Sequence, residues 1–116
     1  MSTAITDIWF VTETELVELA NQLELANINF DSGDGWQWVS GDLLDFRLDI
    51  ILSHLDETKN TQARIFLFDQ NLHFSKGFTD FLTQKLKEIG VSPIYLGSWV
   101  FGENEQYQQN IMKVVT

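Results

Sequence analysis

The chain has no cysteine among its 116 residues, so it has no disulfide, no thiolate nucleophile and no cysteine-based metal site. No apolar run approaches the roughly 18 residues that a membrane-spanning helix needs. The segment 1–7 lacks the basic and long apolar regions of a secretory signal. These absences predict a cytoplasmic protein that does not enter membranes.

Basic residues are missing from the first part of the chain, where the first is Arg47. Nine carboxylates precede it: Asp7, Glu13, Glu15, Glu18, Glu24, Asp31, Asp34, Asp42 and Asp45. The rest of the chain holds eight carboxylates and seven Lys or Arg, so the net charge of −10 is concentrated before Arg47. Such a chain is repelled by phosphate backbones, and we expect no direct binding of nucleic acid.

The composition is that of a folded domain, with 44% hydrophobic and 13% aromatic residues. A length of 116 residues is enough to bury one core but not two. The sequence contains no internal repeat and no low-complexity segment. We therefore expect one acidic α+β domain that spans residues 1–116.

The first part predicts a strand, a helix and a hairpin. The apolar run 8–11 is typical of a strand, and the capping-box spacing of Thr12 and Glu15 predicts a helix over about 13–25. Alternating residues on both sides of Asp34-Gly35 predict a hairpin, with strands near 28–31 and 36–39.

Two further strands are expected in the middle of the chain. Segment 40–42 reads as a turn, and strict alternation of apolar and polar residues then predicts a strand over 44–52. The continuous apolar run in 64–68 predicts a central strand that is covered on both faces.

The last part predicts a second helix over 75–89, which Ser75 caps and Gly90 ends. Pro93 stops the helix from continuing, and a strand is expected over 94–101. The tail fits a C-terminal helix with Glu103 and Glu105 in its first turn, although Ile111–Val115 also suits an edge strand. We favour the helix.

These elements predict a single, mainly antiparallel sheet of four to six strands with two helices on one face. The order resembles a ferredoxin-like sandwich with an extra hairpin, in topology only, and a shared fold does not identify a function. The expected core residues are Leu16, Leu19, Leu23, Phe46, Leu48, Ile50, Phe66, Phe68, Phe81, Leu82 and Leu86.

Asp69 and His73 form the one candidate for catalysis, in the loop between the apolar strand and the second helix. A carboxylate that orients an imidazole is an acid–base pair in principle. The sequence offers no nucleophile or second base beside it, and an Asp after a strand commonly makes a turn or a cap. We therefore prefer a structural role for this pair.

Other chemistry lacks its motif. The glycines form no dinucleotide or phosphate-binding loop, and segment 31–35 lacks the ligand pattern of a calcium loop. His54 with Asp45 and Asp49 suggests at most a surface metal site, but alternating charges on an exposed strand face are the ordinary explanation. We expect no cofactor and no metal.

Trp36 and Trp38 lie at i and i+2 and should project from one face of one strand, either into the core or as a recognition patch. Large aromatic side chains rimmed by charge are typical of protein interfaces. The candidate partner-binding residues are therefore Glu15, Glu18, Asp31, Asp34, Trp36, Trp38, Asp42 and Asp45.

We favour an acidic protein-binding module, such as an inhibitor or immunity-type protein that neutralises a basic partner like a nuclease. The alternatives are a small enzyme or ligand-binding domain that uses Asp69 and His73, and a structural adaptor subunit. Acidity that serves solubility alone is a further reading. The sequence does not predict the oligomeric state.

Overall fold

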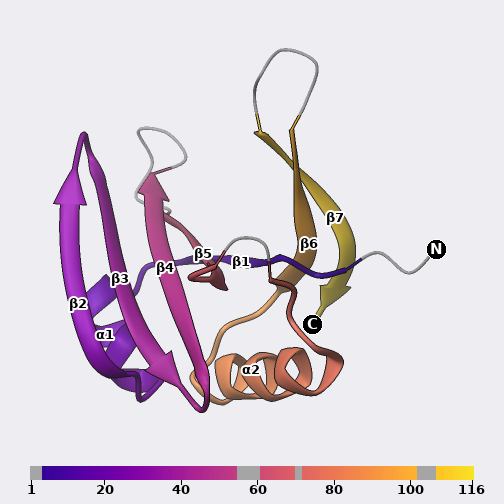
Figure 1. The fold of residues 1–116 in the computed structure, drawn as a ribbon, viewed down its shortest axis with the longest axis horizontal. Helices are drawn as coiled ribbons and strands as arrows, with labels where there is room; N and C mark the ends of the chain where they lie inside the picture. Colours follow the sequence, from indigo (N-terminus) through magenta and orange to yellow (C-terminus); the bar gives the residue numbers. More distant parts are fainter. Residues whose placement is uncertain (1–3, 55–60, 70–71, 102–106) are drawn as a thin grey trace.

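The computed structural model describes residues 4–54, 61–69, 72–101 and 107–116. The elements are β1 (Asp7–Thr12), α1 (Leu16–Gln22), β2 (Ala26–Gly33), β3 (Trp36–Leu43), β4 (Phe46–His54), β5 (Thr61–Leu67), α2 (Lys76–Glu88), β6 (Ile94–Phe101) and β7 (Tyr107–Val115). The strands form one antiparallel sheet in the order β2-β3-β4-β5-β1-β6-β7 (Figure 1). The α+β class and the single antiparallel sheet are confirmed.

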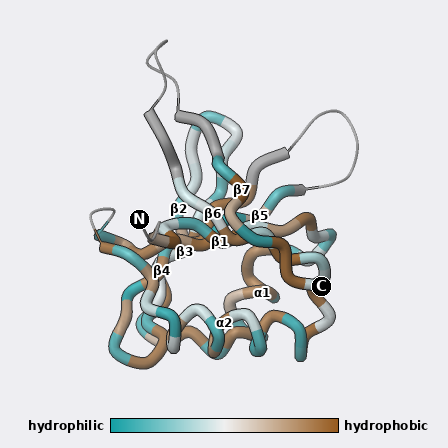
Figure 2. The backbone as a smooth tube through the Cα atoms, turned by 90° about the vertical axis from the view of Figure 1, so that its right-hand side faces the viewer, coloured by the Kyte–Doolittle hydropathy of each residue, from teal (hydrophilic) through white to brown (hydrophobic). Residues whose placement is uncertain are grey.

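Both helices lie on the same face of the sheet, which we call the helix face (Figure 2). One core cluster joins them to alternating residues of β1, β3, β4, β5 and β6, as the two-residue period of a strand requires. Its strand members include Ile8, Phe10, Val39, Leu43, Leu48, Ile50, Ile65, Leu67, Ile94 and Leu96, and its helix members include Leu16, Leu19, Phe78, Leu82 and Leu86. The opposite face, which we call the open face, carries no helix in the described part of the chain.

The second helix follows its sequence signals closely. Ser75 Oγ accepts a hydrogen bond from the Phe78 amide at 3.2 Å, and Gly90 has the positive φ of 92° that favours glycine after a helix. The predicted N-cap and end of this helix are confirmed.

The first helix is shorter than the predicted 13–25. Thr12 remains in β1, where its Oγ1 accepts a hydrogen bond from the Thr14 amide, so the predicted capping box does not form. Glu15 is the N-cap and makes no side-chain capping bond. Glu24 has a φ of 59°, a left-handed conformation that cannot continue the helix.

The hairpin predicted at Asp34-Gly35 is confirmed. Both residues have positive φ, 52° and 82°, which is the type I′ geometry that suits a two-residue hairpin loop. The predicted turn at 40–42 is wrong, since β3 continues to Leu43 and the chain turns at Leu44 and Asp45. Gly41 serves β3 by letting Leu25 approach, because a Cβ there would lie 2.8 Å from the Leu25 Cβ.

The predicted central position of the strand around 64–68 is confirmed, since β5 is fourth of seven. Its expected burial on both faces is wrong, because both helices pack on the same face. Phe66 is only half-buried on the open face, and Phe68 lies beyond the end of β5 with 59% of its surface exposed. Phe81, another expected core residue, is 40% exposed on α2.

The tail forms β7 instead of the favoured helix, and the sheet has seven strands where four to six were expected. β7 pairs with β6 from Ile94↔Val115 to Phe101↔Tyr107, so it supplies hydrogen-bond partners to a strand that would otherwise be an edge. The spacing of Tyr107, Ile111 and Val114 fits a helix and not the two-residue period of a strand, so pairing with β6 decided the outcome. Glu103 and Glu105 lie outside the described residues.

The observed core predicts different stability effects for Leu48 and Phe68, because only Leu48 is buried. Leu48→Ala should lower the free energy of unfolding by about 2–5 kcal/mol, because Leu48 is fully buried and its loss leaves a cavity. Phe68→Ala should change it by less than about 0.5 kcal/mol, although the sequence placed both in the core. Urea unfolding measures both, and equal losses would contradict the one-sided core.

Candidate functional site

One transverse row of side chains crosses the open face, with one residue from each strand. Residues directly opposite each other in an antiparallel pair point to the same face. In sheet order the row is Asp31, Trp38, Ile51, Arg64, Trp9, Tyr95 and Val114. Three of its seven members are aromatic, so the open face is not the polar surface usual for an uncovered antiparallel sheet.

The β1–β6 part of this row is closed to solvent. Trp9 is only 4% exposed and stacks on Tyr95, with ring centroids 5.9 Å apart and an interplanar angle of 20°. The ring also lies over Gly97, where a Cβ would come within 2.7 Å of Trp9 Cη2. Glycine at this position therefore leaves room for the Trp9 ring to lie against the sheet.

A buried ion pair lies beside Trp9. Arg64 Nη2 is 2.9 Å from Asp7 Oδ2, and the two side chains are 11% and 0% exposed. Burial lowers the pKa of Arg64 from its usual value, and the charge of Asp7 opposes this shift. Sequence reasoning missed this pair, although an Asp at the start of one apolar strand and an Arg within another are a recognisable signal.

The β2–β3 end of the row is open and hollowed. A hollow of about 310 Å³ is lined by Gly33, Asp34, Trp36, Trp38 and Ile51. Trp36 is 47% exposed and Trp38 is half-buried. The structure therefore places both indoles on the open face, away from the helices, so neither belongs to the core that the helices cover. Asp31 lies directly across from Trp38 on β2.

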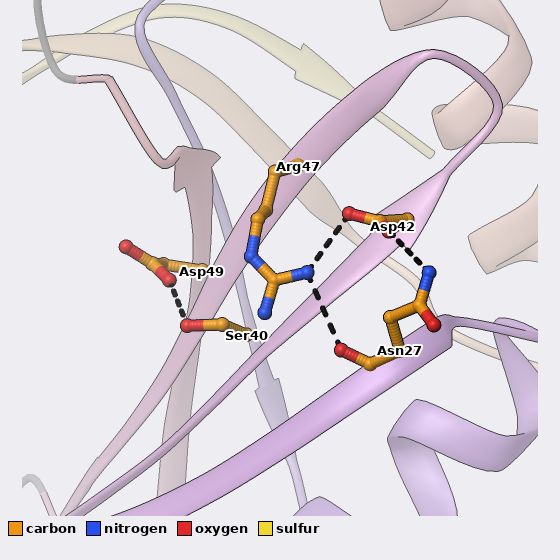
Figure 3. A network of polar contacts seen from close by, with 5 residues as sticks. All are labelled: Asn27, Ser40, Asp42, Arg47 and Asp49. Atoms are coloured by element: carbon orange, nitrogen blue, oxygen red, sulfur yellow. Dashed lines mark hydrogen bonds and ion pairs between the residues drawn. The ribbon is translucent and has the colours of Figure 1, made fainter.

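The other end of β3 holds a polar network instead of a hollow (Figure 3). Asp42 accepts hydrogen bonds from Asn27 Nδ2 at 2.8 Å and from Arg47 Nη1 at 2.9 Å, and Ser40 Oγ donates to Asp49. The bond from Asn27, followed by that from Arg47, lowers the pKa of Asp42 below its usual value. Asp42 is therefore engaged within the chain.

The remaining predicted acidic residues do not converge on one patch. Glu15 and Glu18 are exposed on α1, which lies on the helix face, and Asp45 is exposed in the turn between β3 and β4. That turn and the Asp34-Gly35 turn are at opposite ends of the eight-residue β3, roughly 23 Å apart for an extended strand. Of the predicted set, Asp31, Asp34, Trp36 and Trp38 gather around the hollow.

The acidity is also unevenly placed along the sheet. α1, β2 and β3, with their turns, carry eight carboxylates and no Lys or Arg, and they lie at one end of the molecule (Figure 1). β6 has no charged residue, and Lys113 is the one charge of β7. The charge asymmetry of the sequence thus becomes an asymmetry in space.

Asp69 and His73 lie away from the hollow, between β5 and α2. Both side chains are exposed, and the Asp69 carbonyl accepts a hydrogen bond from the Leu72 amide. The chain thus turns at Asp69, as expected for an Asp that follows a strand.

The described ranges contain no group of three or more His, Asp or Glu placed to hold a metal ion. The side chain of His54 lies outside those ranges. Neither helix of the described part is long and apolar enough to cross a bilayer. Comparison of the chain with protein-family models, curated proteins and solved structures found no match.

The buried ion pair gives a stability prediction. Arg64→Met should lower the free energy of unfolding by about 3–5 kcal/mol, because it leaves the Asp7 carboxylate buried without its cation. The double variant Asp7→Leu/Arg64→Met should regain most of this loss. Lys76→Met is the control, since Lys76–Asp80 is exposed and should change stability by less than about 1 kcal/mol. A harmless Arg64→Met would contradict this account.

The Asp42 network gives a pH prediction. Because its pKa is lowered in the folded state, Asp42 stabilises the fold above its unfolded pKa and loses this effect as the pH falls through the folded pKa. Between pH 6 and pH 2.5 the wild type should therefore lose more stability than Asp42→Asn. Parallel urea titrations at the two pH values measure the difference, with Asp45→Asn as a neighbouring control. Equal losses in wild type and Asp42→Asn would count against the network.

Proposed function

We propose that this protein is an acidic binding module that docks a basic protein on the β2–β3 end of its open face. The observation that carries the proposal is the hollow beside two accessible indoles, with Asp31 and Asp34 next to it. Indole side chains are enriched at the centres of protein interfaces, and carboxylates around them favour a cationic partner.

The charges of this end support a basic partner. Within the described ranges, neither Asp31 nor Asp34 forms an ion pair, whereas Asp42 and Asp7 are each matched by an arginine. The two carboxylates at the hairpin are thus unneutralised while those further along the open face are engaged. An inhibitor or immunity-type protein that covers a cationic active site, such as that of a nuclease, would use this arrangement.

The experiment compares two charge reversals of equal size on different faces. Asp31→Lys/Asp34→Lys alters the hairpin, and Glu15→Lys/Glu18→Lys alters α1 on the helix face. Proteins that the wild type captures from source lysate are purified. Stopped flow then measures the rate at which each of them associates with the wild type and with the two variants. Asp42 is left unchanged because its replacement would break the Arg47 pair.

At low salt we expect the hairpin variant to associate at least about tenfold more slowly than wild type, and the α1 variant to be slowed less. The difference should shrink as salt rises, because exposed charges are screened over about 8 Å at physiological ionic strength. If both variants bind every captured protein as wild type does, the proposal is wrong. Catalysis through Asp69 and His73 would be unaffected by either variant.

We also infer that the inner strands follow a ferredoxin-like plan. The support is the order β4-β5-β1-β6, with α1 after β1 and α2 after β5 on one face, which leaves the β2–β3 hairpin and β7 as additions at the two edges. The proposed site then belongs to the added hairpin. A function that resides there is independent of what other proteins do with the same plan.

A further inference from the structure

We propose that the hollow at the β2–β3 hairpin receives a single arginine side chain of the basic partner. This inference rests on the proposed function and adds the chemical group that is recognised. Three features carry it: the size of the hollow, the indoles that line it, and the carboxylates at its edge.

The size favours a single side chain. At about 310 Å³ the hollow is at the lower limit of the roughly 300–1,000 Å³ that ligand sites occupy, which is small for a nucleotide or a larger cofactor. Gly33 lies directly across from Trp36, and because glycine has no side chain, the space between them stays empty. A Cβ at Gly33 would be 3.9 Å from Trp38 Cη2, so a larger residue there would fit the backbone but fill the hollow.

The wall favours a flat cation. Trp36, Trp38 and Ile51 present apolar surface, and a guanidinium stacks on an indole face while its aliphatic stem packs against apolar side chains. Asp34 lines the hollow and Asp31 lies across from Trp38, so carboxylates are available for the donors of the guanidinium. Lysine would match the charge but lacks the planar surface and the fork of donors.

Among the residues that the structure describes, neither arginine supplies this cation. Arg64 lies directly across from Ile51 but is paired with Asp7, and Arg47 is paired with Asp42 towards the far end of β3. The charge of the hollow is thus left for a group from another molecule.

The test uses short peptides, because the partner is not identified. A pentapeptide with one central arginine between glycines is compared with the same peptide containing citrulline, which has the same shape without the charge, or lysine. Binding is followed by the indole N–H signals of Trp36, Trp38 and Trp9 in ¹H–¹⁵N spectra, which Trp→Phe variants assign.

We expect the arginine peptide to shift the Trp36 and Trp38 signals but not that of Trp9, with a Kd on the order of 1–10 mM, since one exposed contact of this kind is weak. Lysine should bind several-fold more weakly, and citrulline should cause no comparable shift. Equal shifts with arginine and citrulline, or no shift with arginine, would overturn the inference.

Gly33→Val is the decisive variant, because it fills the hollow and leaves every charge in place. We expect it to weaken binding of the arginine peptide at least tenfold. Ser32→Val introduces valine one residue away, on the opposite face, and this variant should bind the peptide as wild type does. Trp36→Leu gives a second measurement if Gly33→Val fails to fold, and it too should weaken binding. Unchanged binding in a folded Gly33→Val would overturn the inference.

The two proposals fail separately. If the purified partner is slowed by Asp31→Lys/Asp34→Lys but binds Gly33→Val as tightly as wild type, the acidic surface is the binding site and the arginine hollow is wrong. If the charge reversal does not change the association rate of the partner, the proposed function is wrong, whether or not the arginine peptide binds.

Discussion

Two short helices on a single face of a seven-stranded sheet are the constraint on which the rest of the structure depends. They cover a sheet face made of every second residue of the strands, and this face supplies the hydrophobic core. The other face has to remain stable in contact with water although it carries Trp9, Tyr95, Trp36 and Trp38. The protein meets this requirement in two different ways along one row of side chains. The difference between them locates the candidate site.

In the β1–β6 part of the open face the aromatic groups are protected within the chain. Trp9 lies down over Gly97 and against Tyr95, and the Asp7–Arg64 pair buries its own charges. At the β2–β3 end the opposite holds, because a glycine and two indoles leave a hollow, and within the described part of the chain Asp31 and Asp34 form no ion pair. A protein that needed only a soluble surface would gain nothing from two partly exposed tryptophans. Exposed aromatic surface of this kind is more often part of an interaction site.

The sequence predicted elements well where local chemistry decides the outcome. The Ser75 cap, the Gly90 stop and the Asp34-Gly35 hairpin all rest on residues that act on their own backbone. It failed where distant pairing decides: the tail became β7 because β6 needed a partner, and Gly41 stayed in a strand because Leu25 packs against it. Trp36 and Trp38 were correctly placed on one strand face, but which face was open depended on where the helices pack. The hollow required a fold to become visible.

The eight carboxylates of α1, β2, β3 and their turns have no Lys or Arg among them, whereas β6 and β7 carry a single charge, so the charge is uneven across the sheet, as in an electric dipole. Six strand spacings of about 4.8 Å place β7 roughly 29 Å from β2, several times the Debye length of about 8 Å at physiological salt. The β6–β7 edge is therefore electrostatically decoupled from the acidic end. Under the proposed function, this asymmetry turns a cationic partner towards the β2–β3 hairpin before contact forms.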